Sequence, residues 1–555
     1  MKRIAVIAGV AAVVLVAASC TAEADPGPSP SPARSMTEAS SSPPMDLARG
    51  PLARAACGLP HRHLLRIWRG YHPERSGQIQ LVPREPNIVG PGYPHAGAAD
   101  HLQDVPLLAY GPEVIRSGRT VGRPVTVADI APTIAGLIGF DFPAPDGMAL
   151  REAPMPGSAP PRLVVTLVWD GGGRVVLDEW PGAWPNLQRT IRWGTWYEHA
   201  SVGSSPSTSA PIHASIGTGA FPRQHGLIGN ALRIEGRIAD PWDEGPAYLR
   251  GPSLADAYDA AGANAPLIGL VGSATVQLGL IGHGSWWEGG DRDIAVLKRR
   301  RGYENPDGFW GVSSTSRPFF STPSYVNELP FITAHHRFAD LLDGRADGAW
   351  LGESIVGLRN GYDTPARIPF ETRLVEEVVR REGFGDDDVT DLLFLNYKLI
   401  DYVGHRWSLH SQQMRQTVRA QDAELPRLIR LLNDEVGRGR WALILTADHG
   451  SQPDPVRLGG RRIDITAIEA HVRSRFDDAD DEPLVDQVQT TQVFLDTEEL
   501  VENGHTLEAV AASVARLSGA EIATPAGPSS ERVFAAVFPS ELMDSLACLP
   551  EARDG

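Results

Sequence analysis

Apolar residues in this chain gather in short unbroken runs that alternate with longer amphipathic stretches. Residues 163–169 (LVVTLVW), 392–397 (LLFLNY) and 441–447 (WALILTA) are rich in aliphatic and β-branched side chains, so we expect strands buried on both faces. Between the last two runs, residues 411–436 have the length and apolar spacing of a helix. Alternating strands and helices predict an α/β fold with a mostly parallel sheet.

The stretch from about 231 to 380 is less regular and richer in Gly, Trp and Tyr. Segments such as GHGSWWEGGDRD and GYENPDGFWGVSS interrupt the alternation of strand and helix. We expect this stretch to be a cap inserted into a main core that spans residues 162–555.

The first residues have the pattern of an export signal. Lys2 and Arg3 precede an apolar run and then small residues before Cys20, and the run is too short for an ordinary membrane-spanning helix. Residues 1–19 are therefore predicted to be a signal peptide and Cys20 to carry a lipid that anchors the exported protein to the cell membrane. Plain cleavage or a retained anchor are the alternatives. Residues 20–50, rich in Pro, Ser and Ala, are expected to be a disordered linker.

Net charge and cysteine content limit the partners and the compartment. The chain has 555 residues and a net charge of −17, which disfavours a nucleic-acid groove or an anionic membrane surface as the main partner. A small phosphorylated substrate stays compatible, because bound cations would dominate the local field. Besides Cys20 the chain has Cys57 and Cys548; an exported compartment permits a disulfide between them, and two free buried thiols are the alternative.

One carboxylate and one hydroxyl stand where an element is expected to end or begin. Asp170 follows the first predicted strand and precedes three glycines, which let the backbone turn sharply and leave the carboxylate accessible; a turn-capping role is the alternative. Ser209 precedes Pro211, which suits the first turn of a helix, and a helix N-terminus favours an alkoxide and a phosphoryl oxygen. A simple N-cap is the alternative, and Ser207 and Thr208 are neighbouring candidates.

Two Asp–His pairs follow the other predicted strands. Asp401 and His405 are four residues apart with Gly404 between them, so one helical turn or a tight loop would direct both at one ion. Asp448 and His449 are adjacent and can converge in a loop that Gly450 permits. Ligand sites of open α/β sheets lie at the carboxyl ends of strands, and imidazole and carboxylate both suit Zn²⁺. A two-ion site needs about three protein ligands per ion and a nucleophile between the ions.

In this order the motifs resemble the alkaline phosphatase superfamily, in particular its type I phosphodiesterase/nucleotide pyrophosphatase branch and phosphate-irrepressible relatives. The similar segments are VWDGG, STSAPIH, TGAFPRQHG, DYVGH and LTADHG. The resemblance implies a three-layer α/β sandwich with two divalent ions, expected to be Zn²⁺. It implies the following roles: one ion held by Asp170, Ser209, Asp448 and His449, the other by Asp401 and His405, and phosphate bound by Asn230.

The family's remaining ligand is a histidine in a Gly-rich loop near its C-terminus, and this chain has no counterpart there. Residues 51–152 resemble that C-terminal part of the family instead. His95 falls at the position of the ligand, and His101 is the second choice. The resemblance therefore implies a circular permutation, in which the family's tail comes first and rejoins its beginning through residues 153–161.

Cys57 and Cys548 flank the implied cut. A disulfide between them would hold the new chain ends together and offset the lost connection.

Three departures from the family bear on the substrate. Ser209 stands where this branch usually has Thr, and Ala210 cannot stack on a base as the aromatic residue of nucleotide pyrophosphatases does. Residues 269–284 lack the Lys-x-Arg pair that monoesterase relatives direct at a dianionic phosphate. We expect a hydrolase of phosphodiester or pyrophosphate bonds that acts through a phosphoserine intermediate. A phosphomonoesterase and a non-catalytic lipoprotein that binds a phosphorylated ligand are the alternatives.

Overall fold

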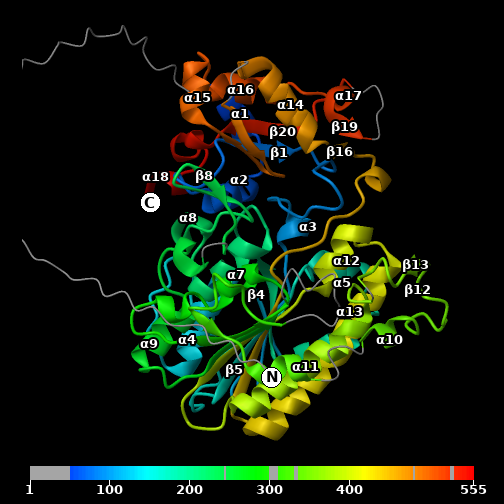
Figure 1. Ribbon diagram of the computed structural model, residues 1–555. Coiled ribbons are helices and arrows are strands. Elements are labelled where there is room, and N and C mark those ends of the chain that lie inside the picture. The colour runs from blue at the N-terminus through cyan, green and yellow to red at the C-terminus, as the bar shows by residue number, and fades with distance from the viewer. Residues whose placement is uncertain are drawn as a thin grey trace, which may run out of the picture. The chain divides into compact units, whose positions relative to one another are not determined.

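A nine-stranded sheet is the centre of the described part of the chain in this computed structural model (Figure 1). Its strands are β3 (Leu107–Tyr110), β4 (Arg119–Thr126), β5 (Leu163–Trp169), β6 (Thr195–Ser201), β9 (Ile268–Gly272), β10 (Asp293–Leu297), β11 (Phe320–Ser321), β14 (Asp391–Tyr397) and β15 (Trp441–Thr446). They lie in the order β11–β10–β9–β14–β5–β15–β3–β6–β4. Every neighbouring pair is parallel except that β3 is antiparallel to β15 and to β6. The prediction of a mostly parallel α/β sheet is confirmed.

The structure describes residues 50–242, 245–298, 310–329, 335–359, 361–478, 482–524 and 530–554. The expected signal peptide, Cys20 and all of the expected linker except Gly50 lie outside these residues. The described residues all belong to one compact unit. No helix among the described residues is both long enough and apolar enough to cross a membrane.

The three apolar runs predicted as strands are β5, β14 and β15, and they lie side by side in the sheet. Their side chains alternate between two hydrophobic cores. In β5, Val164 and Val168 face one core, whereas Val165 and Leu167 face the other. Because both faces of these strands are buried, the runs contain no alternating polar positions.

Helices cover both faces of the sheet, which gives three layers (Figure 1). One face packs against α4 (Ile130–Ile138), α7 (Ser209–Thr218) and α9 (Leu254–Ala261). The other packs against α5 (Arg174–Glu179), α6 (Pro185–Ile191), α11 (Ile368–Glu382), α12 (Leu399–Trp407) and α13 (Gln412–Leu432). The helix expected over 411–436 is α13 followed by a π-helical turn, η9 (Asn433–Gly437). The predicted three-layer sandwich is therefore present.

The cap expected over about 231–380 needs correction, because part of this stretch belongs to the main sheet. β9, β10 and β11 lie within it and form one edge of that sheet beside β14. The runs IGLVG and DIAVL are buried strands, but each has only five residues between Gly-rich loops. Runs this short give little periodic signal, so the surrounding irregular sequence concealed them.

A second sheet contains strands from both ends of the chain. Its order is β17 (Val485–Val488), β18 (Gln492–Leu495), β1 (Ile79–Pro83) and β20 (Phe534–Pro539). β1 pairs antiparallel with both of its neighbours, so Ile79 lies opposite Val493 and Pro539. The helices that share its core are α1 (Pro51–Cys57), α2 (His61–Gly70), α14 (Ile465–Phe476) and α16 (Leu507–Val514). Residues 51–152 are thus no separate domain, since they supply β1 here and β3 and β4 to the main sheet.

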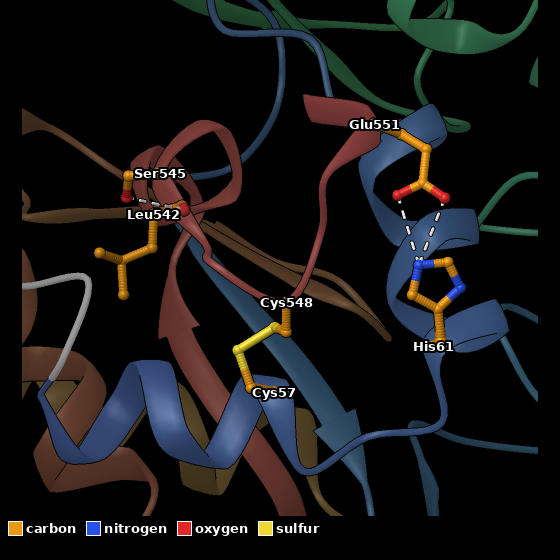
Figure 2. The surroundings of a disulfide bond; sticks show 6 residues. All are labelled: Cys57, His61, Leu542, Ser545, Cys548 and Glu551. Atoms are coloured by element: carbon orange, nitrogen blue, oxygen red, sulfur yellow. Dashed lines mark hydrogen bonds and ion pairs between the residues drawn. A yellow bond between two sulfur atoms is a disulfide. The ribbon is translucent and has the colours of Figure 1, made fainter. Parts of the chain in front are cut away.

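A disulfide joins Cys57 at the end of α1 to Cys548, with their Cα atoms 5.7 Å apart (Figure 2). Beside it, His61 Nε2 lies 3.3 Å from Glu551 Oε1. Because the two cysteines are 491 residues apart, the bond restricts the unfolded chain strongly. Native disulfides of this kind typically add about 2–5 kcal/mol of stability. The structure thus contains the pairing that the sequence left as one of two alternatives.

Shorter elements complete the described residues. The helical ones are α3 (Asp100–Gln103), η2 (Val127–Asp129), α8 (Pro222–His225), η3 (Gly245–Tyr248), η4 (Thr275–Leu280), η5 (Gly284–Trp286), η7 (Ser324–Glu328), α10 (His335–Ala339), η8 (Pro365–Arg367), η10 (Val456–Leu458), α15 (Thr497–Glu502), α17 (Gly519–Ile522), η11 (Ser540–Ser545) and α18 (Glu551–Asp554). The strands are β2 (Ile88–Val89), β7 (Leu232–Ile234), β8 (Arg237–Ala239), β12 (Ala349–Trp350), β13 (Glu353–Ser354), β16 (Arg462–Ile463) and β19 (Ala523–Thr524).

Candidate active site

Three buried carboxylates meet at the carboxyl ends of β5, β14 and β15. Asp170 directly follows β5, Asp448 lies two residues after β15, and Asp401 lies in the first turn of α12, just beyond β14. Their exposed fractions are 0% for Asp170, 4% for Asp401 and 0% for Asp448. Gly171 has a φ of +74°, and a Cβ there would lie 2.8 Å from the Cα atom of Asp401. Glycine therefore permits both the turn after β5 and the close approach of α12.

Ser209 is the first residue of α7 and is buried beside these carboxylates. Its Oγ accepts a hydrogen bond from Lys398 Nζ at 3.0 Å. The neighbouring candidates lie differently: Ser207 Oγ donates to the backbone oxygen of His95, and Thr208 Oγ1 is buried without a hydrogen-bond partner. Among the three hydroxyls, Ser209 has the contact with the charged cluster.

His95 lies beside Asp401 and His405. The Nε2 atoms of His95 and His405 are each 3.3 Å from Asp401 Oδ1, and the three side chains form a group able to hold one metal ion. The ring of His95 also stacks on that of His449, with centroids 3.5 Å apart. Because Asp401 and His405 are one turn apart in α12, both point to the same place, as their spacing predicts.

The second group consists of Asp170, Asp448 and His449. His449 Nε2 lies 3.3 Å from Asp448 Oδ2 and 3.6 Å from Asp170 Oδ1. Asp448 Oδ1 accepts a hydrogen bond from the backbone N–H of Gly171 at 3.0 Å, whereas Asp448 Oδ2 has no hydrogen-bond partner among the described residues and faces the Nε2 atoms of His449 and His213. His449 Nε2 is 3.9 Å from Asp401 Oδ1, so the two groups adjoin each other.

The hydrogen bonds of the histidines show that these groups fit divalent ions. His95 Nδ1 lies 2.8 Å from the backbone oxygen of Ser207, and His449 Nδ1 lies 2.8 Å from that of Gly450. With each Nδ1–H donating to a carbonyl, Nε2 carries a lone pair, which is the usual arrangement of a metal-binding histidine. Burial lowers the pKa of His95 and keeps the ring neutral. The buried His449 Nε2 and Asp448 Oδ2 have no hydrogen-bond partner among the described residues, and a lone pair that faces carboxylate oxygens suits a cation between them.

Lys398, the residue after β14, is a functional side chain that the sequence reading missed. Its Nζ lies 2.8 Å from Asp170 Oδ1 and 3.0 Å from Asp401 Oδ2, besides its contact with Ser209. Burial opposes the ammonium charge, but Asp170, Asp401 and Asp448 outweigh it and raise the pKa of Lys398. In the same way burial opposes ionisation of Asp401, while Lys398 lowers the pKa of that carboxyl.

His213 and Asn396 are two further buried side chains that contact the carboxylates. Asn396 Nδ2 lies 3.0 Å from Asp170 Oδ2 and 3.0 Å from His213 Nε2. Burial lowers the pKa of His213 to about 4, so the ring is neutral at physiological pH. Both carboxylate oxygens of Asp170 accept hydrogen bonds, Oδ1 from Lys398 and Oδ2 from Asn396. Because these donors lie in or directly after β14, that strand helps to orient the carboxylate that follows β5.

A cavity opens beside the first metal-binding group. Asn230, the expected phosphate-binding residue, is exposed and lines it together with Thr208, His95 and His405. Residues 489–492 and Phe494 also line it. None of the described residues that line this cavity is Lys or Arg.

Comparison with known proteins then places the chain. The sequence profile of the family described as type I phosphodiesterase / nucleotide pyrophosphatase matches residues 164–522, more than half of the chain. The protein belongs to this family. The matched part of the chain begins in β5 and includes every site residue named above except His95.

Individual relatives are distant. Alkaline phosphatase PafA of Elizabethkingia meningoseptica is 23% identical over 337 residues, which is 52% of this chain and 60% of that protein. Alkaline phosphatase PhoD of Zymomonas mobilis subsp. mobilis is 23% identical over 324 residues, 55% of this chain and 56% of that protein. The chain thus spans less than two thirds of these curated relatives. The crystal structure of wild-type alkaline phosphatase PafA, 17% identical, superposes with a TM-score of 0.50 over 64% of this chain and 76% of that one, which shows a shared fold.

Replacing His95 tests whether it completes a metal site. We expect His95→Ala, loaded with Zn²⁺ and desalted, to retain about one ion per chain fewer than the wild type, because the Asp401–His405 group would keep only two of its three ligands. Inductively coupled plasma mass spectrometry measures the content. His101→Ala is the matched control, since His101 Nε2 faces Gln452 and lies outside the groups described above. Equal metal content in all three proteins would show that His95 is not a ligand.

Proposed function

We propose that this protein is a metal-dependent hydrolase of phosphoric esters with Ser209 as its nucleophile. The observation that supports this most directly is the convergence of Ser209 Oγ, at the N-terminus of α7, with two groups of carboxylates and imidazoles, all of them buried except His405. A helix N-terminus stabilises negative charge on a serine oxygen and on a bound phosphoryl group. Attack by Ser209 would form a phosphoserine, which water then hydrolyses.

The proposed metal content is two divalent ions, with Zn²⁺ favoured by the imidazole and carboxylate ligands. One would be held by His95, Asp401 and His405, and the other by Asp170, Asp448 and His449, with Ser209 beside it. Bound ions of this kind polarise phosphoryl oxygens and stabilise charge on the attacking and leaving oxygens. Three carboxylates against Lys398 and two divalent ions leave a net positive charge, which suits an anionic phosphoester.

Phosphodiesters or pyrophosphates are the proposed substrates. The cavity beside the site has no Lys or Arg among the described residues that line it, and Asn230 offers an uncharged donor to a phosphoryl oxygen. A singly charged diester needs less compensation there than a dianionic monoester. The names of the alkaline phosphatase relatives favour phosphomonoesters as the second candidate.

Replacement of the nucleophile tests the reaction. Ser209→Ala, loaded with metal, should hydrolyse bis-p-nitrophenyl phosphate at least 1,000-fold more slowly than the wild type, as removal of a covalent nucleophile typically does, while keeping the wild-type metal content. Asn230→Ala should raise KM with a smaller effect on kcat. Intact-mass spectrometry after rapid quenching should find a p-nitrophenyl phosphoryl group on the wild type only, because attack on this diester releases one p-nitrophenolate and leaves the second ester bond intact. Undiminished turnover by Ser209→Ala would refute the assignment of Ser209 as the nucleophile. A tenfold preference of the wild type for p-nitrophenyl phosphate over bis-p-nitrophenyl phosphate would overturn the assignment of diesters as substrates.

We also propose that the chain is a circular permutant of its family. Three observations support this: the family profile begins only at residue 164, His95 lies in the metal-binding group, and β1 is inserted between β18 and β20. Chain ends that meet in space allow such rearrangement, and Cys57 and Cys548 are bonded.

A chain opened at residue 161 and closed from Cys548 to Cys57 by a short flexible linker tests the permutation. It should fold with the wild-type metal content and hydrolytic rate, because every strand pairing and site residue is retained. Circular dichroism and metal analysis measure this. A soluble but unfolded product would contradict the proposal. The control is the original chain order with the same linker added at its C-terminus, which reports any effect of the linker itself.

Export and attachment to a membrane through a lipid on Cys20 remain our proposal for the location. The motif around Cys20 supports it, and that residue lies outside the described part of the chain. Metabolic labelling with radioactive palmitate should mark the wild type and not Cys20→Ala, and the variant should leave the membrane fraction. Equal labelling of both proteins would exclude this anchor.

A further inference from the structure

Lys398 connects the proposed nucleophile to both metal-binding groups. Its Nζ lies 3.0 Å from Ser209 Oγ, 2.8 Å from Asp170 Oδ1 and 3.0 Å from Asp401 Oδ2. Asp170 lies in the second group described above and Asp401 in the first, and the two carboxylates also converge with His449. Lysine is rare in this chain, which has only three, at positions 2, 298 and 398 among its 51 basic residues. Lys398 is also buried, whereas most lysines in proteins lie at the surface.

The contacts account for every donor of the ammonium. A lysine has three N–H groups, and Lys398 directs them to three different oxygens. The side chain is 9% exposed, so water does not compete strongly for these bonds. Its backbone is held between the end of β14 and the start of α12. The ammonium is thus fixed in place and has no N–H left for a phosphoryl oxygen.

We propose that Lys398 is a further catalytic residue that acts on the nucleophile and not on the substrate. This rests on the proposed function, with Ser209 as the attacking group. Lys398 Nζ donates to Ser209 Oγ and stabilises negative charge on that oxygen, a task for which a pre-positioned charged donor is well suited. It thereby supplies at Ser209 a positive charge that comes from the chain itself.

The same contact serves both halves of the reaction. In the first, the Ser209 hydroxyl proton passes to solvent, the Oγ–P bond forms, and the bond to the departing ester oxygen breaks; that oxygen takes a proton from solvent. In the second, water attacks phosphorus, the Oγ–P bond breaks, and Oγ recovers a proton from solvent. Oγ carries developing negative charge in each half, first as nucleophile and then as leaving group. Lys398 keeps its own proton throughout.

This role predicts how the effect of removing Lys398 depends on the charge of the substrate. Because Lys398 has no free N–H for phosphoryl oxygens, its removal should affect phosphomonoesters and phosphodiesters alike. A lysine that contacted the substrate would matter more for the dianionic monoester. If Lys398 only held Asp170 and Asp401 in place, its removal would lower activity by lowering the amount of metal that the protein retains.

The test uses Lys398→Met and Lys398→Arg in the full chain. We expect kcat of Lys398→Met to fall about 100-fold, the size of effect that loss of one pre-positioned donor produces. The fall should be equal within threefold for bis-p-nitrophenyl phosphate and p-nitrophenyl phosphate, at unchanged metal content. Lys398→Arg, which keeps the charge, should recover part of the loss. Lys298→Met is the matched control, since Lys298 is also buried but stacks on Trp310.

A second measurement does not need turnover. Ser209 of the metal-free wild type should react with diisopropyl fluorophosphate, followed by intact mass, at least tenfold faster than Ser209 of Lys398→Met. Equal labelling rates, or no labelling of the wild type, would overturn the proposal. So would a loss of activity that accompanies loss of metal, or one that is tenfold greater for the monoester. Failure of the proposed function would appear differently, as a wild type that is labelled at Ser209 but hydrolyses neither ester.

Discussion

The burial of three carboxylates at adjacent strand ends is the constraint on which the rest of this structure depends. Asp170, Asp401 and Asp448 lose nearly all contact with water. Each buried carboxylate without a partner costs several kcal/mol, and neighbouring negative charges add to that cost. The fold can tolerate the cluster only by surrounding it with positive charge and donors. Lys398 and the N–H groups of Gly171 and Asn396 provide part of this compensation, and divalent ions held between the carboxylates and the Nε2 atoms of His95 and His449 would provide the remainder.

This constraint also explains the unusual route of the chain. One group that could hold a metal ion includes the imidazole of His95, which precedes the part of the chain that the family profile matches. The segment that carries His95 is held by β1 on one side and by β3 on the other, and each strand pairs with elements from the far end of the sequence. The Cys57–Cys548 disulfide restrains the same region. The N-terminal segment is therefore part of the site's framework and not an appendage.

Several features followed directly from the sequence because their causes are local. The runs of β5, β14 and β15 are mostly apolar and lack regular polar alternation, since both faces of these strands are covered, and so they were recognisable. The spacing of Asp401 and His405 matched one helical turn, and α12 has that turn. Other features escaped notice for equally physical reasons. The five-residue strands β9 and β10 were too short to stand out among Gly-rich loops, which made the expected cap too large.

By itself the sequence determined which chemical groups this protein has and the local elements on which most of them lie, because periodicity and turn residues act over a few positions. It also indicated His95, through resemblance to the family pattern. Only the tertiary structure decided which groups meet. Lys398 is one lysine next to a strand until the sheet brings β5 beside β14 and α7 onto its face, and then its ammonium lies within 3.0 Å of three oxygens from separate elements. Such convergence depends on strand order and burial, and neither is encoded in any short stretch of the chain.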